Sequence, residues 1–218
     1  MKIKYYLLNI FFNTISKLYR KILIRKKFYS INIFLYKLTL NGIGILNYQN
    51  NKISGEKYFL QKLLSKNKKM LIFDVGGNIG DYAKTAKTIS DNSKIYSFEP
   101  HPKTFLRLKK SASQNNFLAF NIGFGEKKEV AKIYDYINND GSSHASLYSK
   151  VITDIHKGKT IEHDVKITTI DSFVEKNKIN KIDLLKIDTE GNELSVLKGA
   201  RKTLEKNMID IIHFEFNE

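Results

Sequence analysis

Short apolar runs alternate with amphipathic, helix-length stretches from residue 70 to the end of the chain. This alternation is typical of parallel strands whose two faces are both covered by helices. The pattern predicts strands at 71–75, 95–99, 117–122, 182–187 and 209–216, and helices at 81–90, 103–114, 171–177 and 193–205. We therefore expect an α/β fold built on a doubly wound, mostly parallel sheet.

Two β-like runs interrupt this order, at 130–136 and 164–169, with a serine-rich loop at 141–147 between them. Because both runs fall between the third strand and the next helix, we expect them to form an antiparallel β insertion at one edge of the sheet.

The first third of the chain differs in charge. Residues 1–69 contain 15 Lys and Arg but only one acid, Glu56, whereas residues 70–218 contain 22 basic and 21 acidic residues. We therefore divide the chain into a basic, mainly helical N-terminal segment (1–69) and a domain (70–218). Within this segment, the sequence pattern predicts an amphipathic helix at 5–24, an apolar stretch at 31–40, a Gly-Ile-Gly turn at 42–44 and a helix at 56–64.

The amphipathic helix has two interpretations. It packs on the domain, or it lies on an anionic membrane, to which the basic run 25–27 would add attraction. We favour the membrane contact for residues 1–30. The expected location is the cytoplasm, with a peripheral contact at the inner face of the membrane under the second interpretation. No stretch reaches the ~18 uncharged apolar residues of a membrane-spanning helix.

Composition excludes other classes. The chain has no cysteine, which removes disulfides, thiolate zinc sites and cysteine nucleophiles and leaves the compartment open. Only four of the 37 cations are Arg, the residue best suited to bidentate phosphate and base recognition, so nucleic acid is a disfavoured partner.

The loop after the first predicted strand carries the strongest chemical signal. Asp74 precedes a glycine-rich loop at 76–80, and Glu99 ends the next strand. In a doubly wound sheet, ligands bind beyond the carboxyl ends of the strands. Glycines allow close backbone approach, and a carboxylate such as Glu99 can accept hydrogen bonds from both hydroxyls of a ribose. This pair predicts an adenosine-type cofactor.

A dinucleotide fits this loop poorly. Asn78 and Asp81 stand where a dinucleotide-binding loop has its second and third glycines, and Asp81 would repel a pyrophosphate. Asp74 suits instead a cationic or amino-bearing ligand, such as the methionine part of S-adenosylmethionine. A nicotinamide-dependent oxidoreductase is thus the third hypothesis for this chain.

Over about residues 44–217 the sequence resembles the FkbM-type S-adenosylmethionine-dependent methyltransferases. The resemblance is carried by Asp74–Gly80, Phe98–Pro100, Asn121–Gly123, Ser142–Ser143, Ser146–Leu147, Thr169–Asp171, Ile182–Gly191, Glu193 and Val196–Ala200. Gly77 departs from it, because the family usually has alanine there. The resemblance implies a Rossmann-like class I methyltransferase fold, S-adenosylmethionine as cofactor, and O-methylation of a glycan, a glycan precursor or a similar hydroxyl-bearing metabolite.

The predicted cofactor contacts are Asp74, Gly76, Gly77, Asn78, Gly80, Glu99, Pro100, Asn121 and Ile122. A hydroxyl acceptor also benefits from a general base, which we expect at the carboxyl end of the fourth strand, at Asp188 or Glu190. The alternative is that these two acids cap the helix that follows.

We predict the acceptor side at Ser143, His144 and Glu193. We assign no metal, although Asp188, Glu215 and Asn217 could together hold a divalent cation through oxygen ligands. Of the other histidines, His213 is expected in the core and His101 beside the adenine pocket.

The last predicted strand, 209–216, is apolar on both faces and is therefore expected to be buried on both faces and to need a neighbouring strand. A class I fold normally continues with two further strands. We therefore expect either that the C-terminal strands are missing or that a partner covers this edge. A truncated, non-catalytic relative that binds a cofactor or a partner is the second hypothesis.

Overall fold

The computed structural model describes residues 2–43, 54–64, 69–136, 140–141 and 160–214. The chain divides into two units, Met1–Phe59 and Leu60–Glu218. Helix α3 (Glu56–Leu64) crosses this division. Its Leu60 and Leu64 are almost completely buried and belong to the second unit.

The first unit consists of helix α1 (Lys2–Leu23), a short 3-10 helix η1 (Lys26–Phe28) and helix α2 (Tyr29–Ile43). Asn32 joins the two long helices: its side-chain amide donates to the Leu23 carbonyl at 2.8 Å, and its oxygen accepts from the Tyr19 hydroxyl at 2.5 Å. Helix α2 continues through Gly42, so the turn that we predicted to begin there is wrong.

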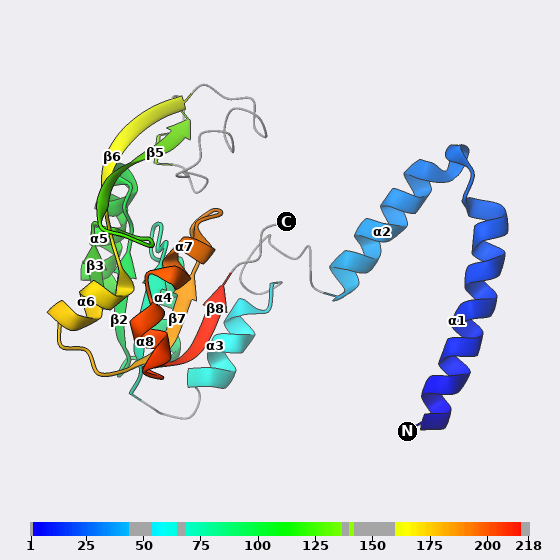
Figure 1. Ribbon diagram of the computed structural model, residues 1–218, viewed down its shortest axis with the longest axis horizontal. Helices are drawn as coiled ribbons and strands as arrows, with labels where there is room; N and C mark the ends of the chain where they lie inside the picture. Colours follow the sequence, from blue (N-terminus) through cyan, green and yellow to red (C-terminus); the bar gives the residue numbers. More distant parts are fainter. Residues whose placement is uncertain (1, 44–53, 65–68, 137–139, 142–159, 215–218) are drawn as a thin grey trace. The chain divides into compact units, whose positions relative to one another are not determined.

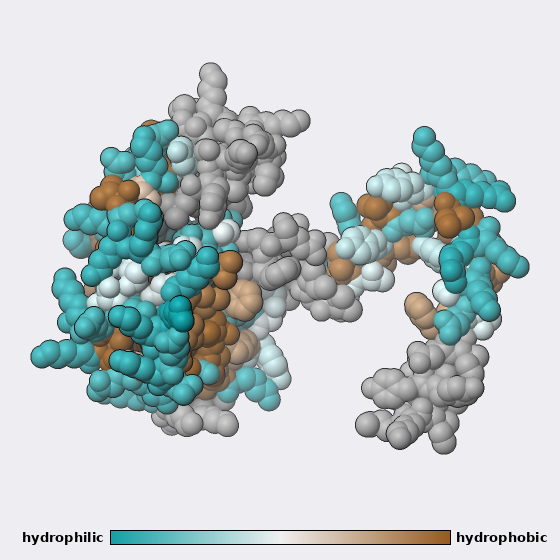
Figure 2. Space-filling view, viewed as in Figure 1, coloured by the Kyte–Doolittle hydropathy of each residue, from teal (hydrophilic) through white to brown (hydrophobic). Residues whose placement is uncertain are grey.

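Apolar side chains of this unit are exposed (Figure 2). Between residues 11 and 42 no residue is buried, and Phe11, Phe12 and Phe34 are each more than 60% exposed. Among the described residues, no helix combines the length and the apolar character that a membrane crossing requires. Both interpretations of the basic segment therefore stay open.

The second unit contains a parallel five-stranded sheet in the order β3-β2-β1-β7-β8 (Figure 1). Its strands are β1 (Leu71–Val75), β2 (Lys94–Phe98), β3 (Leu118–Phe120), β7 (Ile182–Ile187) and β8 (Ile209–Phe214). The predicted α/β fold with a doubly wound, mostly parallel sheet is confirmed. The strand order reverses between β1 and β7, which makes the carboxyl ends of these strands the expected ligand-binding edge.

The helices of this unit are α4 (Asp81–Ile89), α5 (Pro102–Asn115), α6 (Ile170–Lys176), α7 (Glu193–Lys198) and α8 (Arg201–Glu205). On one sheet face, Phe73, Phe98 and Phe173 pack with ring centroids 5.0–5.7 Å apart. Because side chains alternate along a strand, Asp74 points away from this aromatic core toward the opposite face.

The helix predicted at 193–205 is wrong as a single element, because it breaks between α7 and α8. A Cβ on Gly199 would lie 2.0 Å from the Gly125 carbonyl oxygen, so the chain there packs directly on backbone. The Asp171 carboxylate then caps α8 by accepting hydrogen bonds from the Lys202 and Thr203 amides at 3.0 and 2.8 Å.

The β insertion forms a sheet of its own rather than an edge of the main sheet. It contains β4 (Gly123–Phe124), β5 (Glu129–Tyr136) and β6 (Thr160–Thr168) in the order β4-β6-β5. The predicted antiparallel pairing of β5 with β6 is confirmed. In Figure 1 this hairpin extends beyond the main sheet.

Strand β8 pairs with β7 and has exposed side chains at alternate positions. Ile212 and Phe214 are 38% and 48% exposed, whereas Ile209 and Ile211 are half-buried. The expectation that this strand is buried on both faces is therefore wrong for its described residues. A partner on this edge stays a prediction.

Candidate functional site: the carboxyl edge of the parallel sheet

The glycine-rich loop is fixed between the ends of two strands. Gly76, Asn78 and Gly80 have positive φ angles of 79°, 46° and 88°. The amides of Gly76 and Gly77 both donate to the Phe98 carbonyl, at 3.0 and 2.9 Å. A Cβ on Gly76 would lie 1.6 Å from the backbone oxygen of Asp188, so at this position only glycine fits.

A chain of charged side chains lies beneath this loop. Asp74 is completely buried, its Oδ2 accepts from the Ser97 hydroxyl at 2.8 Å, and its Oδ1 lies 3.4 Å from Lys186 Nζ. Lys186 Nζ also donates to Asp188 Oδ2 at 3.0 Å and lies 5.2 Å from the centre of the Tyr82 ring. The Asp74 carboxylate thus links β1 to side chains of β2 and β7, and its direct contact with a cationic ligand stays a prediction.

Glu99 follows β2 and is 7% exposed. Its Oε2 accepts a hydrogen bond from the Asn78 amide at 3.0 Å, and its Oε1 accepts one from the His101 amide at 2.8 Å. Burial raises the pKa of Glu99 to about 7, although these two backbone bonds lower it. Because a carboxylate oxygen has more than one acceptor position, both oxygens can also accept from a diol.

Asn121 holds the backbone beside this glutamate. Its side-chain amide donates to the carbonyl oxygens of Glu99 and Pro100, at 2.9 and 3.0 Å. Ile122 is partly buried and packs against the main core. The structure therefore brings Pro100 and Asn121 together with Glu99, whereas Ile122 contributes to packing.

The predicted base Glu190 lies in the loop between β7 and α7. It adopts a positive φ of 52°, which is uncommon for a residue with a side chain. Burial above all, together with the negative charges of Asp188 and Glu193, raises the pKa of Glu190 to about 7, although Lys186 lowers it. A carboxylate with this pKa is a stronger base than an ordinary glutamate at neutral pH.

Glu193 organises the same loop. Its Oε1 accepts hydrogen bonds from the Thr189 amide, the Thr189 hydroxyl and the Gly191 amide, at 2.9, 3.0 and 3.2 Å. Glu193 therefore holds the loop that precedes α7, and the alternative that Asp188 and Glu190 cap this helix stays a prediction. The contact of Glu193 with a substrate stays a prediction.

Other predicted residues have different outcomes. Ser143, His144, Glu215 and Asn217 lie outside the described residues. His213 is half-buried on the edge strand β8, with its Nδ1 3.4 Å from the Tyr82 hydroxyl, so its predicted place in the core is wrong. Burial and the Lys186 charge lower the pKa of His213, although Asp188 raises it.

Three residues that no sequence motif connects come together in the fold. His101, Asp140 and His163 bring one ligand atom each to within 4.8 Å of one another. The His101 ring is buried 4.6 Å from the ring of His163, on the side of the β insertion. The three residues are 39 and 23 positions apart in sequence, so no local spacing motif could have indicated them.

A parallel sheet with a glycine loop at its switch point and an acid at the end of the next strand is the arrangement of a doubly wound α/β domain of the Rossmann-like class. Residues 74–218 match the family model of the methyltransferase FkbM domain. The chain belongs to this family.

Two curated relatives show the same similarity. The hexuronic acid methyltransferase AglP of Haloferax volcanii is 30% identical over 156 residues, which cover 70% of this chain and 59% of that protein. Methyltransferase 1 of Beauveria bassiana is 29% identical over 144 residues, which cover 59% of this chain and 57% of that protein. The chain thus spans less than two thirds of the length of either relative.

Among solved structures, a methyltransferase FkbM from Methylobacillus flagellatus KT aligns with a TM-score of 0.42 and 17% identity. The alignment covers 72% of this chain and 39% of that one.

Proposed function

We propose that this protein is an S-adenosylmethionine-dependent O-methyltransferase that acts on a hydroxyl of a glycan, a glycan precursor or a similar metabolite. Membership of the FkbM methyltransferase family supports the reaction class. The observation that carries the cofactor assignment is the Glu99 carboxylate, held by two backbone amides beside a loop with three positive φ angles.

The residues of this edge fit an adenosine cofactor. Glu99 can accept hydrogen bonds from the two ribose hydroxyls. Gly76 and Gly77 pack against the Asp188 backbone and the Ser97 side chain, which allows the tight turn of the loop beside Glu99. Asn121 holds the two peptide groups that follow the glutamate, on either side of Pro100, and so fixes the backbone from which the Glu99 carboxylate extends. S-Adenosylmethionine bound here would supply an activated methyl group.

The protein then has to align the acceptor oxygen, exclude water and remove the hydroxyl proton. Among the described acids at the end of β7, Asp188 accepts a hydrogen bond from Lys186 Nζ through one carboxylate oxygen. Glu190 has a pKa raised to about 7 by burial. We assign Glu190 as the general base and Asp188 as a residue that positions the loop.

The acceptor class rests on the relative AglP, a hexuronic acid methyltransferase. A hexuronic acid offers two kinds of oxygen, the ring hydroxyls and the carboxylate. A hydroxyl requires a base before it can attack a methyl group, whereas an ionised carboxylate does not. The raised pKa of Glu190 therefore favours a hydroxyl acceptor.

A methyl-transfer assay tests this proposal. The full chain is incubated with S-adenosylmethionine and either hexuronic acid-containing or neutral glycans. Released S-adenosylhomocysteine is quantified, and the product is identified by mass spectrometry before and after mild alkali. We expect a methyl ether that survives alkali. A methyl group removed by alkali would be an ester and would contradict a hydroxyl acceptor, and cofactor binding without turnover on any glycan would favour the non-catalytic relative.

A further inference from the structure

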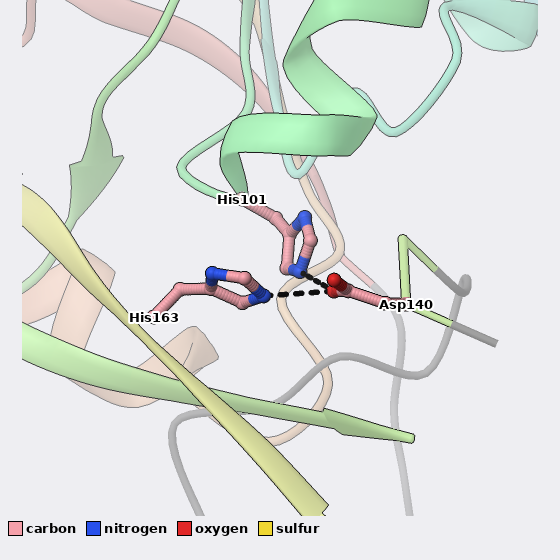
Figure 3. Close-up of side chains that lie close together, drawn as sticks. All are labelled: His101, Asp140 and His163. Carbon is pink, nitrogen blue, oxygen red and sulfur yellow. Dashed lines mark hydrogen bonds and ion pairs between the residues drawn. The ribbon is translucent and has the colours of Figure 1, made fainter. Parts of the chain in front are cut away.

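Three side chains from three different elements converge beside Glu99. His101 is the N-cap residue of α5, Asp140 lies in the turn after β5, and His163 lies on β6. The Nε2 atoms of His101 and His163 lie 3.0 and 2.8 Å from the same oxygen, Asp140 Oδ1. Figure 3 shows both rings pointing toward this carboxylate.

The group is shielded from solvent. The His101 side chain is completely buried, and those of Asp140 and His163 are 7% and 19% exposed. Although His101 Nε2 is close to Asp140, no hydrogen bond with acceptable geometry reaches it in the described part of the chain. A buried ring nitrogen without a hydrogen bond normally has a reason, and a bound ion is one that fits these neighbours.

Two imidazoles and one carboxylate are a donor set that binds first-row divalent metals. Ligand atoms about 2.1 Å from one ion, at tetrahedral or octahedral angles, are separated by roughly 3.0–3.4 Å. The 3.0 Å between His101 Nε2 and Asp140 Oδ1 already falls in this range, and the 2.8 Å between His163 Nε2 and the same oxygen would have to lengthen by a few tenths of an ångström. All three ligand atoms lie within 4.8 Å of one another.

The surrounding residues orient these donors. His101 Nδ1 accepts a hydrogen bond from the Thr104 amide at 3.4 Å and lies equally far from the Thr104 hydroxyl. Metal binding at Nε2 requires the other tautomer, in which Nδ1 carries the proton and donates it to this hydroxyl. Lys103 Nζ contacts the other oxygen, Asp140 Oδ2, at 2.6 Å and holds the carboxylate with Oδ1 toward the histidines. Asp135 is completely buried, and its Oδ2 lies 3.5 Å from His101 Nε2, which adds negative charge beside the group.

We propose that His101, Asp140 and His163 bind one divalent transition-metal ion, with Zn²⁺ as the best match to this donor set. Three protein ligands leave at least one position for water. Because one ligand precedes α5 and the other two belong to the insertion, the ion would link the β5–β6 insertion to the start of α5. Its first ligand, His101, is two residues after Glu99.

Metal titration of the full chain tests the site without reference to methyl transfer. The untagged protein is stripped with a chelator and then titrated with Zn²⁺ by calorimetry and with Co²⁺ by visible absorption. We expect one equivalent of metal per chain, d–d bands of bound Co²⁺, and a higher melting temperature with Zn²⁺. His163→Gln keeps a side-chain donor for Asp140 but replaces the imidazole, and should weaken Zn²⁺ binding at least about tenfold.

Asp164→Asn is the matched control, because its exposed side chain lies next to His163 on the same strand. His213→Ala controls for metal bound by a histidine outside the group. Both variants should bind Zn²⁺ as the wild type does. A wild-type chain that binds no Zn²⁺ would overturn the proposal even if a variant failed to fold, and so would a folded His163→Gln chain with unchanged affinity. Either result would mean that His101, Asp140 and His163 do not bind a metal ion.

Discussion

Two glutamates at the carboxyl edge of the sheet have acid–base properties that depend on burial. Burial raises the pKa of both Glu99 and Glu190 to about 7. Their surroundings differ, because Glu99 accepts two backbone hydrogen bonds, whereas Glu190 lies beside the like charges of Asp188 and Glu193. We therefore assign binding to the first and proton removal to the second.

The role of Glu190 predicts a pH dependence of turnover. Only the ionised form can accept the acceptor's proton, so kcat should rise from pH 6 to pH 8 with a midpoint at about 7. Glu190→Gln should lower kcat by about 10²–10⁴-fold and leave cofactor affinity nearly unchanged. Steady-state rates across this pH range measure both effects. A variant that retained wild-type kcat and the same pH profile would exclude Glu190 as the base.

The raised pKa of Glu190 also predicts how the stability of the folded chain changes with pH. In the unfolded chain this carboxyl loses its proton near its ordinary pKa of 4.5, whereas in the folded chain it keeps the proton until about pH 7. The folded state thus binds more protons between these values, and the contribution of Glu190 to stability falls as pH rises through this window. Melting temperatures should show a smaller fall for Glu190→Gln than for the wild type. An equal fall would mean that Glu190 does not titrate in this range.

Some of the site could be predicted from sequence and some could not. The glycine loop and Glu99 were predictable because both follow directly from the ends of adjacent strands. The orientation of Glu193 was not, because a helix-start glutamate can face either a ligand or its own loop. The histidine cluster was hidden for another reason: Asp140 and His163 meet only after β5 has paired with β6.

At the scale of elements, the glycine loop differs at one position from the family pattern, and the packing around that position explains the difference. Gly77 stands where the resemblance leads us to expect alanine. A Cβ at Gly77 would lie 1.9 Å from the Ser97 hydroxyl oxygen and 3.2 Å from Ser97 Cβ. The Ser97 hydroxyl therefore occupies the space that the methyl group of an alanine would need, and it uses that position to donate to Asp74 Oδ2.

This contact predicts a compensating pair of substitutions. Gly77→Ala alone should destabilise the domain by about 1–3 kcal/mol, as other overpacked sites do. Combining it with Ser97→Gly should recover part of that loss, because the clashing hydroxyl is removed. Denaturant unfolding of both single variants and the double variant measures the coupling. Additive effects would contradict a direct clash.

The hydrophobic pattern predicted the boundaries of helices and strands correctly where local sequence determines them. Strands β1 and β7 lie at their predicted positions because buried apolar runs are unambiguous. The break between α7 and α8 was missed because its cause is tertiary: Gly199 packs on the Gly125 backbone, and Asp171 caps α8 from a distance of 31 residues. The insertion formed its own sheet because β3 ends at Phe120 and β4 pairs with β6 instead.

At the scale of the whole molecule, the basic N-terminal segment differs from the domain in charge and in burial. Its described helices bury none of their residues between positions 11 and 42. Exposed apolar side chains together with Lys and Arg are the features of a helix that lies in a membrane interface. We propose that residues 1–30 bind an anionic membrane surface.

Removal of residues 1–30 should reduce association with phosphatidylserine-containing vesicles at low salt. Each cation near such a surface contributes roughly 1 kcal/mol, so association of the full chain should also weaken as salt is added. The double variant Phe11→Ser and Leu18→Ser separates the apolar contribution from the charge. Vesicle sedimentation measures all three chains, and equal association of the full and shortened chains would favour a helix that packs on the domain.

Calorimetric titration with S-adenosylhomocysteine tests the central claim most directly. Glu99→Ala removes two acceptors for the ribose hydroxyls, and hydrogen bonds to charged groups contribute about 1.5–3 kcal/mol each. We predict one binding site per wild-type chain and affinity at least about tenfold lower in Glu99→Ala. Glu205→Ala, which changes an exposed glutamate on α8, should bind as the wild type does. Equal affinities of the wild type and Glu99→Ala, or no binding to the wild type, would contradict the account.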